Sequence, residues 1–75
     1  MRNIIHIEVY KSDNYYIAEG LNLPLVTQGK TLDEVIENVK EAVELTLEGE
    51  KLSDFDFSEN PQVLVNFELP SPVYA

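Results

Sequence analysis

The sequence predicts a small α+β domain whose elements follow the order β-β-β-α-β. Apolar and polar residues alternate near both ends of the chain, over residues 5–9 and 63–69, as in half-buried strands. Between these segments, residues 32–48 carry apolar residues at helical spacing. A chain of 75 residues has room for one hydrophobic core, so we expect a single domain over residues 1–75, with a loose tail at 71–75.

The first two strands are expected to form a hairpin. Ile5, Ile7 and Val9 occupy alternate positions, and the turn formers Ser12, Asp13 and Asn14 follow directly. The return strand is predicted from residue 15 to about residue 19, where aromatic and β-branched residues are frequent. A short third strand, residues 25–28, would complete an antiparallel meander.

A helix over residues 32–48 has the clearest boundary signals. Thr31 stands at the N-cap position, and Glu34, three residues later, completes a capping box. Gly49 lies where a C-terminal cap belongs. The apolar positions that define the buried face are Leu32, Val35, Ile36, Val39, Val43 and Leu47.

The segment after the helix, residues 49–61, is rich in turn formers and is predicted to be a loop anchored by Phe55 and Phe57. A fourth strand follows, bounded by Pro61 and Pro70. One helix can cover only one face of the sheet, and Ile4, Tyr10 and Leu64 are candidates for the other face. An apolar patch there favours a homodimer or a higher homo-oligomer.

The charge balance limits the possible partners. The chain has 14 acidic and 5 basic residues, a formal net charge of −9 and a pI near 4.2, which disfavours direct contact with nucleic acid. A basic protein is the expected partner. The absence of cysteine favours a reducing cytoplasm, and no stretch is apolar enough for a signal peptide or a membrane span.

Residues suited to catalysis are few. His6 is the single histidine and should lie on the strand face opposite Ile5 and Ile7, as a solvent-side or interface residue. Glu8, Glu19 and Glu68 are the acids expected on strands, where they are more often solvated than metal-bound. We therefore expect no catalytic residues, no metal site and no cofactor, with a Mg²⁺-dependent nuclease as a less favoured alternative.

The outer face of the predicted helix is acidic. Leu45 falls beside Asn38 and Glu34, away from the buried positions, and is a candidate interface residue. Two interpretations remain open: a solvated face that favours solubility, or a contact surface for a basic partner. The acids, which we call the acidic stripe, are Asp33, Glu37, Glu41, Glu44 and Glu48; Glu37, Glu41, Glu44, Glu48 and Leu45 are the predicted partner-binding residues.

Residues 26–45 resemble the core signature of HicB-like antitoxins, a T-Q-G-x-T-x-x-E-A-x-x-N-x-x-E-A pattern that follows a three-stranded meander. The similarity extends over roughly residues 3–48, and Val35 replaces the usual alanine. Gly29 is interpreted as permitting a sharp exit from the third strand, and Asn38 as hydrogen-bonding locally on the helix flank. The matching residues are Thr27, Gln28, Gly29, Thr31, Glu34, Asn38, Glu41 and Ala42.

The resemblance implies a partial ribonuclease H-like fold without catalytic acids. It also implies a function: the protein would bind a small basic RNase toxin of the HicA type and block the toxin's active site. Many members of the family carry a further C-terminal DNA-binding segment, which does not follow the fourth strand here, so autorepression through its own DNA contacts is not expected. The alternative is an orphan HicB-like domain that oligomerises and has no toxin partner.

Overall fold

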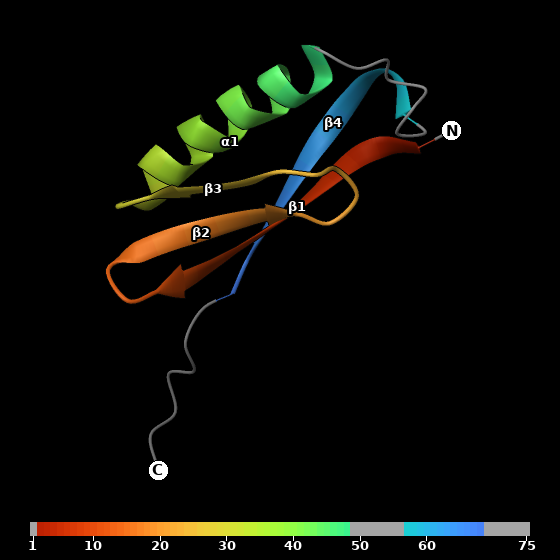
Figure 1. Cartoon of the computed structure of the whole chain (residues 1–75). Helices are drawn as coiled ribbons and strands as arrows, with labels where there is room; N and C mark the ends of the chain where they lie inside the picture. Colours follow the sequence, from red (N-terminus) through yellow and green to blue (C-terminus); the bar gives the residue numbers. More distant parts are fainter. Residues whose placement is uncertain (1, 49–56, 69–75) are drawn as a thin grey trace.

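The computed structural model describes residues 2–48 and 57–68, and for residues 2, 3 and 57–60 it describes the backbone alone. Three strands, β1 (Arg2–Ser12), β2 (Tyr15–Gly20) and β3 (Val26–Gly29), precede the helix α1 (Leu32–Glu48). A fourth strand, β4 (Phe57–Phe67), follows it. The predicted α+β class and the order β-β-β-α-β are confirmed (Figure 1).

The four strands form one sheet in the order β3-β2-β1-β4. β1 pairs with β2, and β2 with β3, both in antiparallel orientation, so the predicted meander is confirmed. β4 returns on the far side of β1 and runs parallel to it. The long connection through α1 allows this parallel return, because a short turn cannot join parallel strands.

The core lies between α1 and one face of the sheet. Ile5, Ile7 and Val9 of β1 are fully buried, as their alternation predicts, and they meet the buried face of α1. Burying side chains of this size contributes roughly 1.5–3 kcal/mol each. Figure 1 shows α1 lying across the sheet on the side of β3. The remaining core residues are Ala18, Leu23, Val35, Val39 and Val43.

Backbone contacts fix the start of α1. The Glu34 N–H donates to Thr31 Oγ1 at 3.0 Å, which confirms Thr31 as the N-cap. Gly29 is buried at the end of β3, and its φ is not positive. A Cβ at this position would lie 2.5 Å from the Val35 nitrogen. Gly29 does stand where the chain leaves β3, but a close approach of β3 to the helix backbone, and not a positive φ, is what requires glycine there.

Asn22 extends the hydrogen bonding of β1 beyond the end of β2. Its Oδ1 accepts from the His6 N–H at 2.8 Å, and its Nδ2 donates to the Ile4 carbonyl at 2.9 Å. The Leu21 N–H also donates to the His6 carbonyl, at 2.8 Å. The Asn22 side chain thus occupies the place of a strand backbone and satisfies two polar groups of β1.

The start of the fourth strand differs from the prediction. The loop predicted over residues 49–61 is wrong for residues 57–61, which belong to β4. Pro61 lies inside the strand and is tolerated because β4 is at the edge of the sheet, where a missing N–H need not break a ladder. A register irregularity accompanies this part of the strand, opposite Arg2 and Ile4.

Several predictions concern residues outside the described parts of the chain. These are the Gly49 cap, the anchoring role of Phe55, the placement of Leu69 and Pro70, and the tail at 71–75. The end of the fourth strand is described: β4 ends at Phe67, so Glu68, expected on the strand, lies just after it. Phe57 lies within the backbone of β4, and its predicted role as an anchor concerns a side chain that is not described.

In the part of the chain that the structure describes, no helix lies over the second face of the sheet. Ile4 is 38% exposed and Leu64 is 45% exposed, and Tyr10 is half-buried on the same face. His6 lies there too, beside Leu64 in the register of β1 and β4, so its predicted placement opposite Ile5 and Ile7 is confirmed.

Candidate functional site

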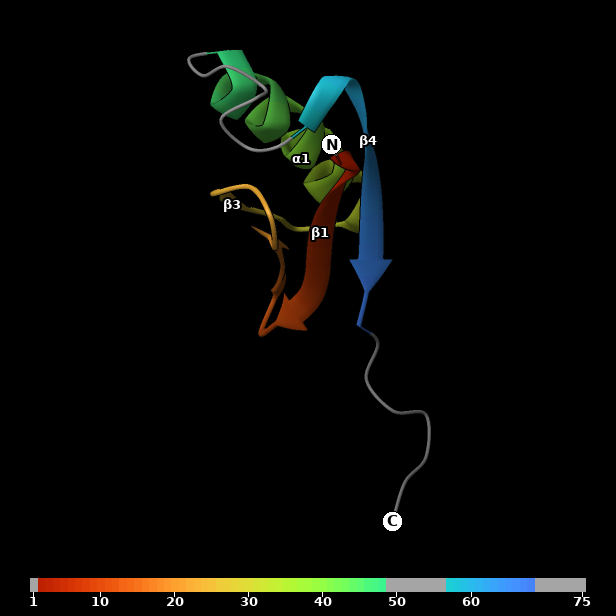
Figure 2. The same ribbon diagram turned by 90° about the vertical axis from the view of Figure 1, so that its right-hand side faces the viewer.

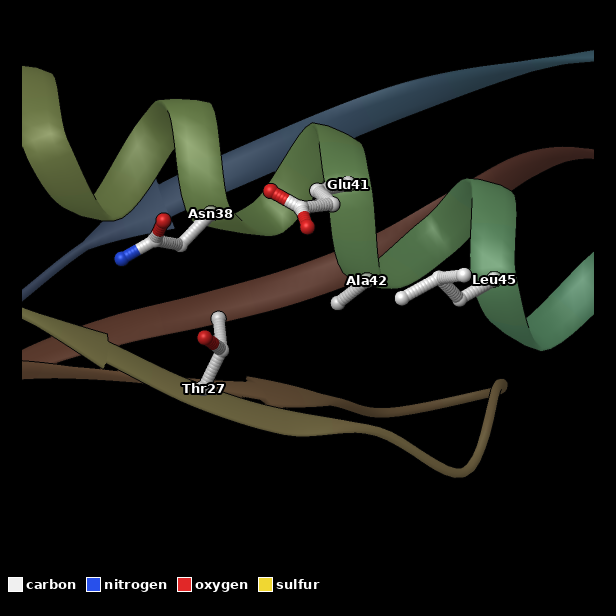
Figure 3. A pocket seen from close by; sticks show the side chains of 5 residues that line it. All are labelled: Thr27, Asn38, Glu41, Ala42 and Leu45. Carbon is white, nitrogen blue, oxygen red and sulfur yellow. The ribbon is translucent and has the colours of Figure 1, made fainter.

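A shallow groove runs between the flank of α1 and strand β3, with a volume of about 190 Å³. Thr27 rises from β3 on one side, and Asn38, Glu41, Ala42 and Leu45 descend from the helix on the other (Figure 3). The helical residues recur at intervals of three and four, which places them on one flank. Ala42 has the smallest side chain of the five lining residues and fills the least of the space between the two elements.

Asn38 closes one end of the groove by a tertiary hydrogen bond. Its Nδ2 donates to the carbonyl of Gln28 in β3 at 2.7 Å. The prediction that Asn38 bonds locally on the helix is therefore wrong, because its partner lies ten residues earlier on a neighbouring strand. The bond also occupies a carbonyl at the sheet edge and holds β3 against the first half of α1.

Leu45 lines the other end of the groove and is 63% exposed. Figure 3 shows its side chain extending alongside Ala42, toward the β3 side of the helix. Its predicted position beside Asn38, away from the buried face, is confirmed. A leucine with most of its surface in water gains little from folding, so its apolar surface is available to a partner.

The acidic stripe lies on the solvent side of α1, and all five of its residues are exposed. Lys40 is the sole basic residue of the helix, and its Nζ lies 3.5 Å from a Glu37 carboxylate oxygen. Both side chains are largely exposed, so this ion pair contributes little to stability. Glu41 belongs to both the stripe and the groove.

The two ends of the stripe differ in their effect on the helix. Asp33 lies in the first turn, where a carboxylate interacts favourably with the helix dipole. Glu48 lies in the last turn, which contains no basic residue, and Glu44 lies just before that turn. In the last turn the same dipole disfavours negative charge by about 0.3–1 kcal/mol per residue, and the effect falls off before it. The C-terminal half of the stripe is therefore acidic at a cost to the helix.

The open sheet face carries the strand acids. Glu8 and Glu19 are direct cross-strand partners, and the Tyr10 hydroxyl donates to Glu19 Oε1 at 2.8 Å. This hydrogen bond raises the pKa of Tyr10 above its usual value, with smaller contributions from burial and from the charges of Glu19 and Glu68. Within the described residues, no group of three or more potential ligands is placed to hold a metal ion.

The structure brings together two of the five residues predicted to bind a partner, Glu41 and Leu45, at the groove. Glu37, Glu44 and Glu48 lie along the exposed face of the same helix and do not line it. Thr27, Asn38 and Ala42 were missed as lining residues. All three are matching residues of the sequence signature, so their place in that pattern is the signal that identifies them.

Comparison with known proteins finds a relative that is similar to part of the chain. The chain is 52% identical over 40 residues to a UPF0150 protein of Archaeoglobus fulgidus. The match covers 52% of this chain and 58% of that protein, so it spans somewhat more than half the length of its relative, whose name states no activity. No family model and no solved structure matches the chain. Among the described residues, no helix has the length and apolar character to cross a membrane.

Proposed function

We propose that the chain is a non-enzymatic, protein-binding antitoxin of the HicB-like kind, acting in the cytoplasm on a small basic RNase toxin of the HicA type. The T-Q-G signature of residues 27–42 and its meander-helix context support the family assignment. The observation that carries the proposal is the acidic C-terminal half of the stripe, placed beside an exposed leucine and a groove.

The charges near the end of α1 need an explanation beyond folding. Solubility is favoured by a net charge away from zero, but it does not require acidic residues near the C-terminal end of the helix, where Glu48 weakens it. A basic partner at this surface would turn the unfavourable charges into favourable contacts. Opposite charge on the partner would also accelerate encounter and discriminate against acidic proteins.

The groove suits one long basic side chain of the partner. Ala42 and Leu45 offer apolar surface to the methylene stem of a lysine or arginine, while the Glu41 carboxylate lies on the same flank for the cationic head. We assign the groove as an anchor point and the stripe as the surrounding polar rim. The partner-binding residues are then Glu37, Glu41, Glu44, Glu48 and Leu45.

Charge reversal of Glu44→Lys with Glu48→Lys tests the proposal without weakening the fold. Each change removes an attraction of about 0.2–1 kcal/mol and adds a similar repulsion, so binding of the basic toxin should weaken by roughly 1–4 kcal/mol, at least about fivefold in Kd. The helix itself should gain stability, since cations suit its C-terminal end. Binding is measured by titration calorimetry, and folding by thermal unfolding.

The matched control is Glu8→Lys with Glu68→Lys on the opposite sheet face. Both double variants change the formal net charge from −9 to −5, because each substitution replaces −1 by +1. The control should bind within about twofold of the wild type. Equal weakening in the two variants would show that overall charge, and not the stripe, governs binding. Unchanged binding in both would leave the stripe as a solvated face.

The alternative function is an orphan HicB-like domain that binds only copies of itself. The uncovered sheet face, with Ile4 and Leu64 exposed, favours this second candidate. A neighbouring reading frame for a small basic protein, whose toxicity the chain suppresses on co-expression, distinguishes the antitoxin from the orphan domain. A metal-dependent nuclease has no comparable support in the described residues.

A further inference from the structure

Within the described residues, no strand pairs with the outer edge of β4. β4 is the last strand in the order β3-β2-β1-β4 and extends over 11 residues, whereas the opposite edge strand, β3, has four. Figure 2 shows β4 at the border of the sheet. A long edge strand presents a row of backbone donors and acceptors to any other strand, and proteins usually protect it with charged side chains or cover it.

Pro61 and the register irregularity beside it protect only the start of β4. Residues 60–67, Asn-Pro-Gln-Val-Leu-Val-Asn-Phe, contain no charged side chain. Val63 is 42% exposed and Phe67 is 44% exposed on the face that carries the helix, and Leu64 is exposed on the other. The backbone of α1 lies closest to β3 and β2, so the helix is nearer the opposite border of the sheet than the border at β4.

Backbone direction identifies which residues face outward. The Glu68 N–H donates to the Val9 carbonyl at 2.8 Å, so the backbone groups of Glu68 point toward β1. Because these directions alternate along a strand, the N–H and C=O groups of Val63, Val65 and Phe67 point away from the sheet. The same three residues carry their side chains on the helix-bearing face, opposite Ile5, Ile7 and Val9 in the register.

We propose that β4 pairs in antiparallel orientation with β4 of a second copy, across a two-fold axis at Val65. This arrangement places Val65 opposite itself and Val63 opposite Phe67 of the other copy, so the two most exposed apolar residues of the helix-bearing face cover each other. The two four-stranded sheets become one continuous sheet. The interface is isologous, as in most homodimers.

The self-complementary register of β4 favours a second copy as the occupant, and the neutrality of this edge permits it. Two molecules of net charge −9 repel each other, and a dimer therefore requires contact where the acids are absent. The neutral run at 60–67 provides such a surface, and it lies on the opposite border of the sheet from β3 and the groove. A basic partner, in contrast, would find no carboxylate in this run to recognise. The inference is independent of the proposed antitoxin function.

Cysteine crosslinking tests the register directly, because the natural chain has no cysteine. In the proposed dimer the Val65 Cα atoms are about 5.5 Å apart, within the range for a disulfide. The Val63 Cα atoms are about 14 Å apart, since four residues separate them along the strand. Under oxidising conditions Val65→Cys should form a covalent dimer, and Val63→Cys, the matched control on the same face, should not.

Sedimentation of the full chain tests the dimer without crosslinking. The wild type should have twice the mass of one 8.5 kDa chain, and Phe67→Lys should have the mass of one. Val26→Lys, which places the same charge on the opposite edge strand where Val26 is 71% exposed, should remain dimeric. Circular dichroism establishes that both variants are folded.

Three results would overturn the proposal: a wild type that stays monomeric throughout the micromolar range, dissociation by Val26→Lys and not by Phe67→Lys, or crosslinking of Val63→Cys in preference to Val65→Cys. These measurements use the pure chain alone. Toxin binding is measured separately, with the helix variants. A failure to bind toxin would therefore not change the expected results for the dimer.

Discussion

Gly29 provides the sharpest test of how this fold is held together, through the substitution Gly29→Ala. The added methyl carbon would lie 2.5 Å from the Val35 nitrogen, 2.8 Å from the Val35 Cα and 3.0 Å from the Glu34 carbonyl carbon. Ordinary contact begins near 3.4 Å, so the closest approach is too short by 0.9 Å, the difference between 3.4 and 2.5 Å. All three neighbours are backbone atoms, which no side-chain rotation can move away.

The two explanations for Gly29 predict changes of opposite sign. If glycine served only backbone flexibility, alanine would be tolerated because φ is not positive here, and it would stabilise the fold by about 0.4–1 kcal/mol through the unfolded state. The close approach instead predicts overpacking, which costs about 1–3 kcal/mol. For a domain of this size, that lowers Tm by about 4–24 °C.

Thermal and urea unfolding of Gly29→Ala, followed by circular dichroism, measure the change. The control is Gln28→Ala, an exposed neighbour whose backbone carbonyl still accepts the Asn38 hydrogen bond. We expect the control to remain within about 0.5 kcal/mol of the wild type. A Gly29→Ala protein as stable as the wild type, or more stable, would refute the steric explanation and restore the conformational one.

Two further predictions concern polar side chains of the sheet. Asn22→Ala should destabilise the fold by about 1–3 kcal/mol and speed exchange of the His6 amide, because His6 and Ile4 each lose a hydrogen-bond partner; an unchanged exchange rate would contradict this. The second prediction concerns Tyr10, whose tyrosinate absorbance is identified as the signal that Tyr10→Phe removes. This absorbance should titrate above pH 10.0, because the hydrogen bond to Glu19 raises the pKa of Tyr10. Glu19→Gln should lower that pKa. The stability that this hydrogen bond provides is present below pH 10.0 and is lost as the pH rises through the raised pKa of Tyr10. If Tyr10 titrated at its usual pKa in both the wild type and Glu19→Gln, the hydrogen bond would be excluded.

Local patterns predicted the elements of this fold where one physical signal dominated. The helix follows from its apolar spacing and the Thr31 cap, and its observed bounds, Leu32–Glu48, are those expected. The alternation of Ile5, Ile7 and Val9 identified the buried face of β1 correctly. In both elements the residues that determine the structure are close together in sequence.

Contacts between distant residues could not be predicted in the same way. Residues 57–61, the last part of the expected loop, belong to β4 because β1, more than fifty residues away in sequence, provides a strand to pair with. Pro61 is tolerated there because β4 is an edge strand. Asn22 bonding to β1 and Asn38 bonding to Gln28 depend equally on tertiary placement. Turn and helix propensities contain no information about these partners.

The candidate site was predicted in part. Helical geometry placed the acidic stripe and Leu45 outside the core, as observed. The groove itself depends on the distance between α1 and β3, which the spacing of helical residues alone does not specify. Thr27 lies on β3 and not on the helix, so its place in the groove follows only from the packing of α1 against β3.

Quantitative binding of the basic toxin by the wild type and by Glu44→Lys with Glu48→Lys tests the central claim most directly. Both proteins are titrated with the same toxin at two salt concentrations. We predict at least about fivefold weaker binding by the variant, with a smaller difference at high salt because exposed charges are screened. Equal affinity of two folded proteins at both salt concentrations would contradict a binding surface on the C-terminal half of α1.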